Sequence, residues 1–275
     1  MNPVRFPIHS GNAPTRGQPI TSLDDWRRLA PPRLRHHWQP RHSALELARH
    51  WVGGQLPVDV AHALQSHAAL KSFRPKEAFA RLETRFDAHP RGREHDLIVF
   101  GSIGRAPAVL DVEGKVTETY GELVRSALEK ARRAPGSYIP GRMERLSRAI
   151  LGRPVEGSVL DLRYQLLYGV ASTLVQAART NARKAIFLAH VFNRHTASPQ
   201  LYERNDEELC EFLQHLGRRS WRLKSPAEIT GPFTVPGDTS VDEFRIDPGV
   251  ELYIGRVVTS LLPAASLEPV VAHDA

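Results

Sequence analysis

The sequence predicts an α/β fold in which a mixed β-sheet is flanked by helices. Short apolar runs that are typical of strands alternate with longer segments of helical periodicity along the 275 residues. Two of these runs, at 96–100 and 108–115, are separated by a short turn and predict a β-hairpin. The length fits one large domain with extensions.

The elements follow in order from local patterns. Residues 1–42 are rich in Pro, Arg, His and Gly and have no sustained period, so we expect an irregular N-terminal arm. Ser43 is the expected cap of a first helix that Gly53 and Gly54 end, and a second short helix is expected at 57–70. The apolar spacing further predicts helices at 119–133, 141–151, 158–181 and 206–216, and strands at 185–192 and 250–260. The folded domain is thus expected at 43–262, followed by a C-terminal tail at 263–275.

Composition narrows the class of protein. The formal net charge of +7 favours a polyanionic partner such as nucleic acid, but an arginine-rich composition inherited from a GC-rich genome would give the same balance. No apolar run approaches the ~20 residues that span a bilayer, and the N-terminus lacks the apolar stretch of a signal peptide. A single cysteine, Cys210, excludes an internal disulfide. We therefore expect a cytoplasmic protein that has no membrane contact.

The second strand of the hairpin carries three charged residues at alternate positions. Asp111, Glu113 and Lys115 share one face of this strand, and the other face is apolar. Asp96 begins the preceding strand, so the hairpin brings its carboxylate close to Glu113. Clustered carboxylates suit Mg²⁺, which polarises a phosphoryl oxygen and acidifies a bound water, and Lys115 could orient that water. The alternative is an exposed edge strand with solvated ion pairs, and the short spacing alone favours it.

Asp96, a turn and then Glu113-Gly114-Lys115 resemble the D…(D/E)-x-K motif of the PD-(D/E)XK nuclease superfamily. The sequence is also similar to a poorly characterised group of bacterial proteins assigned to that superfamily. The similar segments cover most of residues 37–259 and read HWQPRHSALELARHW, HDLIVFG, LDVEGKVTETYGE, RYQLLYGVAST and ELYIGRVV. The resemblance implies a restriction-endonuclease-like sheet.

The resemblance also implies roles for residues outside the motif. Glu83 lies upstream of Asp96, where such nucleases often place a further acidic residue. Arg163 and Gln165 match a helix that packs beside the site, and many relatives carry a Gln there. Glu118 matches an acidic position just after the motif strand.

Two features depart from the family pattern. The segment before Asp96, residues 91–95, lacks the expected lead-in. Asp111 stands where an apolar residue is more usual, and it is either a spare metal ligand or the partner of an arginine.

The function expected from these features is a Mg²⁺- or Mn²⁺-dependent nuclease with DNA as its expected substrate. The expected catalytic residues are Asp96, Glu113, Lys115 and Gln165, the metal ligands Glu83, Asp96 and Glu113, and the supporting or phosphate-contacting residues Arg163, Glu118 and Asp111. Two alternatives stay open: a non-catalytic nucleic-acid- or protein-binding module on the same fold, and a hydrolase of another phosphate ester. Oligomerisation also stays open. The basic stretch 218–224, which contains Trp221, either contacts nucleic acid or ends a helix before a core Trp.

Overall fold

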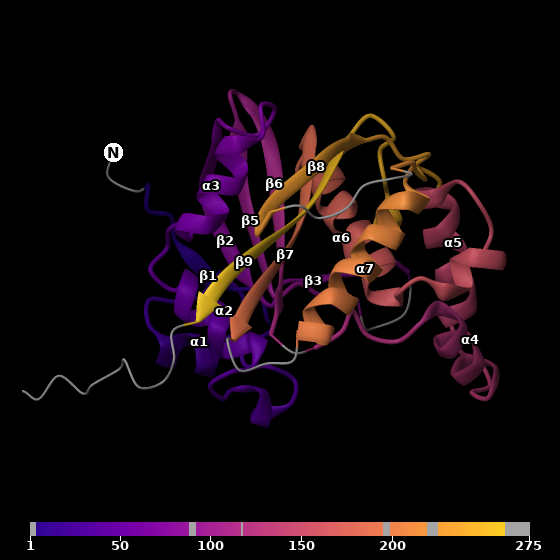
Figure 1. Ribbon diagram of the computed structural model, residues 1–275, viewed down its shortest axis with the longest axis horizontal. Helices are drawn as coiled ribbons and strands as arrows, with labels where there is room; N and C mark the ends of the chain where they lie inside the picture. Colours follow the sequence, from indigo (N-terminus) through magenta and orange to yellow (C-terminus); the bar gives the residue numbers. More distant parts are fainter. Residues whose placement is uncertain (1–3, 88–91, 117, 195–198, 219–224, 262–275) are drawn as a thin grey trace, which may run out of the picture.

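A seven-stranded mixed sheet forms the centre of the molecule (Figure 1). The computed structural model describes residues 4–87, 92–116, 118–194, 199–218 and 225–261. The strand order is β1-β2-β5-β6-β7-β9-β8. The strands are β1 (Ile8–Ser10), β2 (Phe73–Ala80), β5 (Leu97–Ile103), β6 (Ala106–Lys115), β7 (Lys184–Arg194), β8 (Ala227–Phe233) and β9 (Glu251–Leu261). β3 (Glu83–Thr84) and β4 (Arg93–Glu94) form a second, two-stranded sheet.

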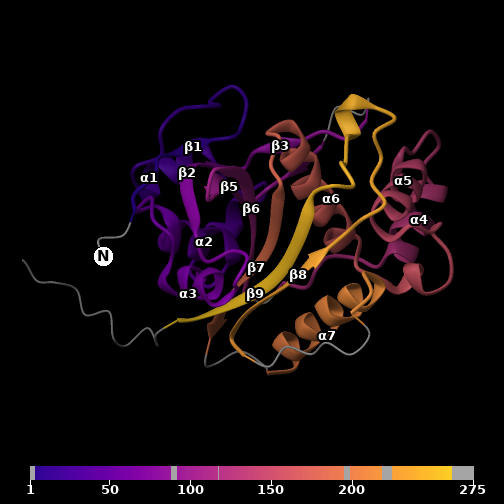
Figure 2. The same ribbon diagram turned by 90° about the horizontal axis from the view of Figure 1, so that it is seen from above.

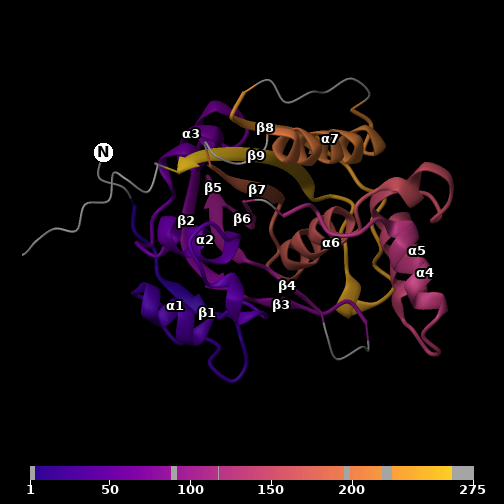
Figure 3. The same cartoon turned by 60° about the horizontal axis from the view of Figure 1, so that its bottom comes forward.

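Helices cover both faces of the central sheet, as Figures 2 and 3 show. One face carries α1 (Leu23–Leu29), α2 (Ser43–Trp51) and α3 (Val58–Ser66). The other face carries α4 (Val124–Arg132), α5 (Ile139–Leu151), α6 (Tyr164–Arg179) and α7 (Pro199–His215). Short 3-10 turns, η1 (Arg35–His37), η2 (Gly157–Asp161) and η3 (Asp242–Phe244), lie in the connections. The predicted α/β class with a mixed, helix-flanked sheet is confirmed.

The predicted hairpin is β5 and β6, which pair in antiparallel register with Leu97 opposite Val112. β6 then pairs in parallel with β7, and β7 in parallel with β9. Leu110 and Val112 join the core beneath α2, whereas Val109 joins the core beneath α6. The period of two along β6 therefore directs its charged residues toward α6.

The expectation of an irregular arm at 1–42 is wrong. This segment contains β1 and α1, and it buries Phe6, Ile8, Trp26 and Leu29 in the core beneath α2 and α3. Elements of three and seven residues are too short to show a period in the sequence. Residues 219–224 and the expected tail at 263–275 lie outside the described residues. Among the described residues, no helix combines the length and apolar character required to cross a membrane.

β2 and β8 were not expected from the sequence, and each has a break in its pattern. The register of β2 shifts between Pro75 and Glu77, and that of β8 shifts between Thr230 and Phe233. Pro75 and Pro232 cannot donate to a ladder, and strands tolerate proline mainly at edges and bulges. β2 is held by its pairing with β5, and β8 by its pairing with β9, so tertiary contacts place both strands.

A buried hydrogen-bond chain ties α2 and α3 to the sheet. Trp51 Nε1 donates to His190 Nδ1 at 3.1 Å, and His190 Nε2 lies 2.9 Å from Thr259 Oγ1. Thr259 donates in turn to Asp59 at 2.7 Å. The indole N–H can only donate, so the proton of the neutral His190 ring resides on Nε2. Burial, aided by the nearby His50, lowers the pKa of His190 from 6.5 to about 3.

The hydrogen-bond chain through His190 predicts that the folded protein loses stability in acid. The unfolded chain protonates His190 near pH 6.5, whereas the folded chain resists protonation down to about pH 3. As the pH falls through this window, the contribution of His190 to the free energy of unfolding should decrease by about 1.4 kcal/mol per pH unit. Urea denaturation of His190→Gln should show a shallower pH dependence than the wild type. The exposed His62→Gln variant is the control, and an equal slope in all three proteins would contradict the assignment.

Candidate functional site

A row of polar side chains lies between β6 and the first turn of α6. Lys115 Nζ donates to Glu113 Oε1 at 3.2 Å and to Gln165 Oε1 at 2.9 Å. Gln165 Nε2 donates to the same oxygen of Glu113. Glu113 and Lys115 are buried, with 4% and 3% of their surfaces exposed, and Gln165 is half-buried. The structure thus brings together three of the residues expected to be catalytic.

Asp96 joins this group from the neighbouring strand. It directly precedes β5, and the register of the hairpin places it beside Glu113. Its Oδ2 accepts a hydrogen bond from the Gly114 amide at 3.0 Å, and its Oδ1 lies 3.6 Å from Arg81 Nη1. Burial and then the charge of Glu113 raise the pKa of Asp96 to about 7, against the opposing effect of Arg81. Burial and the nearby Glu113 therefore disfavour the ionised form of Asp96.

Arg93 occupies the other side of Glu113, and sequence reasoning did not identify it as a site residue. Its Nη2 donates to Glu113 Oε2 at 2.5 Å, and its Nη1 donates to Asp111 Oδ2 at 3.0 Å and to Ser172 Oγ at 2.9 Å. Arg93 is only 5% exposed. Both carboxylate oxygens of Glu113 are thus bonded to cationic side chains. The sequence feature that could have indicated a role for Arg93 is Asp111, because a buried carboxylate requires a cationic partner.

The sequence left two interpretations of Asp111, a spare metal ligand or the partner of an arginine, and the structure supports the second. Asp111 is fully buried and also accepts a hydrogen bond from Thr173 at 2.7 Å. Burial opposes its ionisation, but Arg93 and His95 outweigh burial and hold the pKa of Asp111 below its usual value. Asp111 therefore anchors Arg93 and lies behind the residues that could meet a ligand.

A glycine in α6 makes room for this cluster. A Cβ at Gly169 would lie 2.7 Å from a ring carbon of Phe187 and 3.5 Å from Arg93 Nη2. Contacts under 3.0 Å to a packed ring require movement of one partner. Gly169 thus lets α6 approach β7 closely enough for Ser172 and Thr173 to reach Arg93 and Asp111.

Three expected site residues lie elsewhere. Glu83 accepts a hydrogen bond from the Gly92 amide at 2.6 Å and lines a neighbouring cavity rather than the one that contains Asp96. Arg163 donates to the carbonyl oxygen of Gly121 at 2.7 Å and to Glu208 at 2.5 Å, so it links α6 to α7.

Glu118 holds the beginning of α2. Its carboxylate accepts from the Ser43 amide at 3.2 Å and from the Ser43 hydroxyl at 2.8 Å. Ser43 is the first residue of α2, and the cap position is His42, which makes no side-chain capping bond. The expected serine cap is thus replaced by a carboxylate from a distant part of the chain, which also favours the helix dipole.

Asp96, Glu113 and Gln165 line a cleft of about 720 Å³. Its cationic and aromatic lining residues are Arg33, Arg81, Arg93, Arg142, His37, Tyr138, Tyr164 and Tyr168. Tyr164 and Tyr168 stack with ring centroids 5.2 Å apart. Lys115 is not part of the lining, and it reaches the cleft through Glu113 and Gln165. Carboxylates surrounded by arginines can hold a cation and also attract a phosphate.

The donor set fits a hard divalent cation that shares its ligands with a substrate. No group of three or more His, Cys, Asp or Glu residues is placed to hold a metal ion within the described residues. Mg²⁺ is commonly held by one or two carboxylates together with waters and substrate phosphates, and carboxylates also suit Mn²⁺. A cation at this point would favour the ionised form of Asp96, which burial and Glu113 disfavour. Asp96 and Glu113 are therefore the residues that could hold it.

The buried pairing of Arg93 predicts a large effect on stability. Arg93→Met leaves Asp111 without its main counter-charge, so we expect a loss of about 3–5 kcal/mol in the free energy of unfolding. The double variant Arg93→Met/Asp111→Leu should lose less than the two single variants combined, because no buried carboxylate is left unpaired at 111. Urea denaturation gives all these values.

The matched control is Arg85→Met. The side chain of Arg85 is 61% exposed and lies 3.5 Å from Glu83, so its loss should change stability by only about 0.5 kcal/mol. An Arg93→Met variant as stable as Arg85→Met would contradict the role given to Arg93.

A comparison with protein-family models finds a match that covers most of this fold. A family model described as "Domain of unknown function (DUF6946)" matches residues 19–260. The match begins before α1 and ends within β9, so it includes every residue of the cleft. No curated protein and no solved structure matches the chain. Because the model spans most of its length, the chain belongs to the DUF6946 family.

Proposed function

We propose that this protein is a metal-dependent phosphodiester hydrolase of the PD-(D/E)XK type that acts on DNA. The observation that carries the proposal is the grouping of Asp96, Glu113, Lys115 and Gln165 at one end of the β5–β6 hairpin, beside a cleft lined by arginines. The order of the acidic residues and the lysine agrees with the motif that the sequence resembles. We also place the protein in the cytoplasm as part of this proposal.

Each residue has a physical role in this chemistry. Asp96 and Glu113 would hold Mg²⁺ or Mn²⁺, which supplies polarisation of a phosphoryl oxygen and a more acidic bound water. Lys115 and Gln165 bind the same oxygen of Glu113 and so fix the direction of its carboxylate. The ammonium of Lys115 also places positive charge behind the carboxylates, where it favours charge developing on a phosphate.

The cleft lining suits a nucleic acid. Arg33 donates to Glu94 at 3.0 Å and Arg81 bonds to the same carboxylate, so two guanidinium groups share one direct partner. Such groups bind phosphate oxygens in a bidentate manner. The tyrosines add aromatic surface to the lining, of the kind that nucleic-acid-binding proteins use to contact bases.

A second candidate function rests on Arg93. Its guanidinium is buried against Glu113 and already supplies positive charge at the site. A protein in which Arg93 takes the place of a metal ion would keep the arginine-lined cleft and bind nucleic acid without cleaving it. This binding module is the alternative to the hydrolase.

The two candidates differ in metal-dependent cleavage. Glu113→Gln should lose both metal affinity, measured by isothermal titration calorimetry, and cleavage of plasmid and single-stranded DNA. Lys115→Met should keep most of the metal affinity but lower the cleavage rate by about 10²–10³-fold, the usual cost of removing one electrostatic group. Glu129→Gln and Lys71→Met, both exposed residues outside the cleft, are the charge-matched controls.

The outcomes separate the functions. DNA binding without cleavage in Mg²⁺ or Mn²⁺ would establish the binding module, and an assay with small phosphate esters tests the third reading, a hydrolase of another phosphate ester. Cleavage that survives in both Glu113→Gln and Lys115→Met would place the active site elsewhere.

A further inference from the structure

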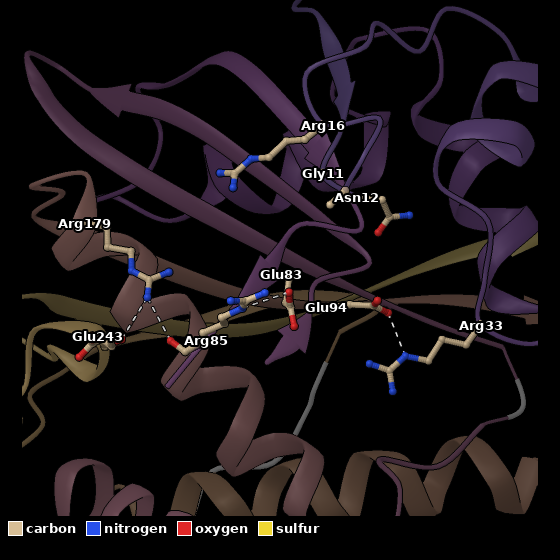
Figure 4. A pocket seen from close by; sticks show the side chains of 10 residues that line it. Gly11, Asn12, Arg16, Arg33, Glu83, Arg85, Glu94, Arg179 and Glu243 are labelled. Atoms are coloured by element: carbon tan, nitrogen blue, oxygen red, sulfur yellow. Dashed lines mark hydrogen bonds and ion pairs between the residues drawn. The ribbon is translucent and has the colours of Figure 1, made fainter. Parts of the chain in front are cut away.

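A second, larger cavity adjoins the candidate site. It has a volume of about 830 Å³ and lies over the β3–β4 hairpin, between the loop after β1 and the end of α6 (Figure 4). Arg33 and Glu94 line both this cavity and the cleft that contains Asp96 and Glu113. A third cavity, of about 480 Å³, shares Arg16 and Arg179 with it. The three cavities are thus neighbours that share lining residues, in a series that begins at the candidate site.

Two carboxylates in this cavity are already paired. Glu94 accepts from Arg33 and Arg81. Glu83 accepts from the Gly92 amide at 2.6 Å and lies 3.5 Å from Arg85. Glu83 and Glu94 therefore have neighbours of their own. A third lining carboxylate, the exposed Glu243, acts on Arg179 through its charge.

Within the part of the chain that the structure describes, Arg16 and Arg179 are the arginines of this cavity that make no ion pair or hydrogen bond with a carboxylate. Arg179 donates only to main-chain oxygens, those of Arg85 and Glu243, each at 3.0 Å. Arg16 makes no hydrogen bond or ion pair with another described residue. Figure 4 shows both guanidinium groups projecting into the same space from separate elements. Burial and the charge of Arg16 lower the pKa of Arg179, and together they outweigh the opposing charge of Glu243.

The loop that carries Arg16 is held in place by specific contacts. Ser10 Oγ and Thr15 Oγ1 both donate to the carbonyl oxygen of Leu29, at 2.8 and 3.2 Å. A Cβ at Gly11 would lie 2.4 Å from the Cα of Leu82, so only glycine lets the loop approach the end of β2 so closely. The base of the loop is thus fixed, and the cost of ordering Arg16 around a ligand is reduced.

We propose that Arg16 and Arg179 form a subsite for a phosphate of the nucleic-acid backbone, next to the phosphate bound at Asp96 and Glu113. The inference rests on the proposed function, and it adds the direction in which the strand leaves the site. The strand passes from the cleft over Arg33 and the β3–β4 hairpin to the end of α6. Arginine suits this role because its planar group forms two parallel hydrogen bonds to phosphate oxygens.

The test measures binding without cleavage. Fluorescence anisotropy of labelled single-stranded and duplex DNA, in EDTA and over a range of salt, compares the full-length wild type with Arg16→Ala and Arg16→Ala/Arg179→Ala. The double variant should bind about tenfold more weakly, and its plot of log affinity against log salt should be less steep by roughly 1–2, since each phosphate contact contributes about 0.7–0.9. Arg16→Ala should show about half of this change in slope with an unaltered fold, because Arg16 is exposed and has no partner to lose.

The control variant is Arg132→Ala/Arg133→Ala, which removes the same charge from exposed positions at the end of α4, outside these cavities. An equal loss of affinity in this control would mean that the effect arises from net charge alone, and it would overturn the subsite. Inorganic phosphate is the second probe. Weak binding of phosphate to the wild type supports a contact with the nucleic-acid backbone. Tight binding of phosphate, together with unchanged DNA affinity in the variants, would assign the arginines to a free anion.

The two proposals fail in different ways. If the wild type binds DNA but the Arg16 and Arg179 variants keep its affinity and salt dependence, the subsite is wrong and the proposed function is unaffected. If the arginine variants lose affinity but the wild type never cleaves, the subsite stands on a binding module. A wild type that does not bind DNA would overturn both.

Discussion

The pairing of Arg93 with Asp111 and Glu113 is the interaction on which the rest of the site depends. Burying these three charges costs several kcal/mol per ion unless every partner is in place. Ser172 and Thr173 of α6 supply the remaining hydrogen bonds, and Gly169 lets that helix approach closely enough to do so. The cluster thus joins β4, β6 and α6 at one point. Asp96 follows Arg93 by three residues, so the same pairing also delivers Asp96 to Glu113.

This arrangement leaves two neighbouring carboxylates in opposite electrostatic conditions. Glu113 has a cationic side chain on each of its oxygens, whereas Asp96 has an amide at one oxygen and a more distant guanidinium at the other. Burial and then the charge of Glu113 raise the pKa of Asp96 to about 7. A cation would be drawn first to Asp96, and Glu113 would share it while keeping Arg93 and Lys115 behind it. The competition between such a cation and Arg93 is the physical difference between a hydrolase and a binding module on this fold.

Arginines outside the cluster extend the site across the surface. Arg33 and Arg81 share the carboxylate of Glu94, and Arg85 faces Glu83, so these ion pairs surround the β3–β4 hairpin between the two cavities. Arg16 and Arg179 differ because neither makes a hydrogen bond or ion pair with a carboxylate of the described residues, and Arg179 donates to main-chain oxygens. Glu118 completes the frame by fixing the beginning of α2 beside the cleft. The place where a polyanion would bind therefore depends on which arginines are paired with a carboxylate of the described residues, and not on the total charge of the chain.

The sequence by itself determined the features that depend on local periodicity. The hairpin, the common face of Asp111, Glu113 and Lys115, and the helix that carries Gln165 all follow from repeats of two and of about 3.6 residues. Only the tertiary structure decided the features that join distant segments. It showed that Asp111 serves Arg93, that Glu83 and Arg163 lie outside the cleft, and that the first 42 residues add β1 and α1 to the fold. Burial and pairing energies arise from contacts between segments far apart in the chain, and no local pattern encodes which segments meet.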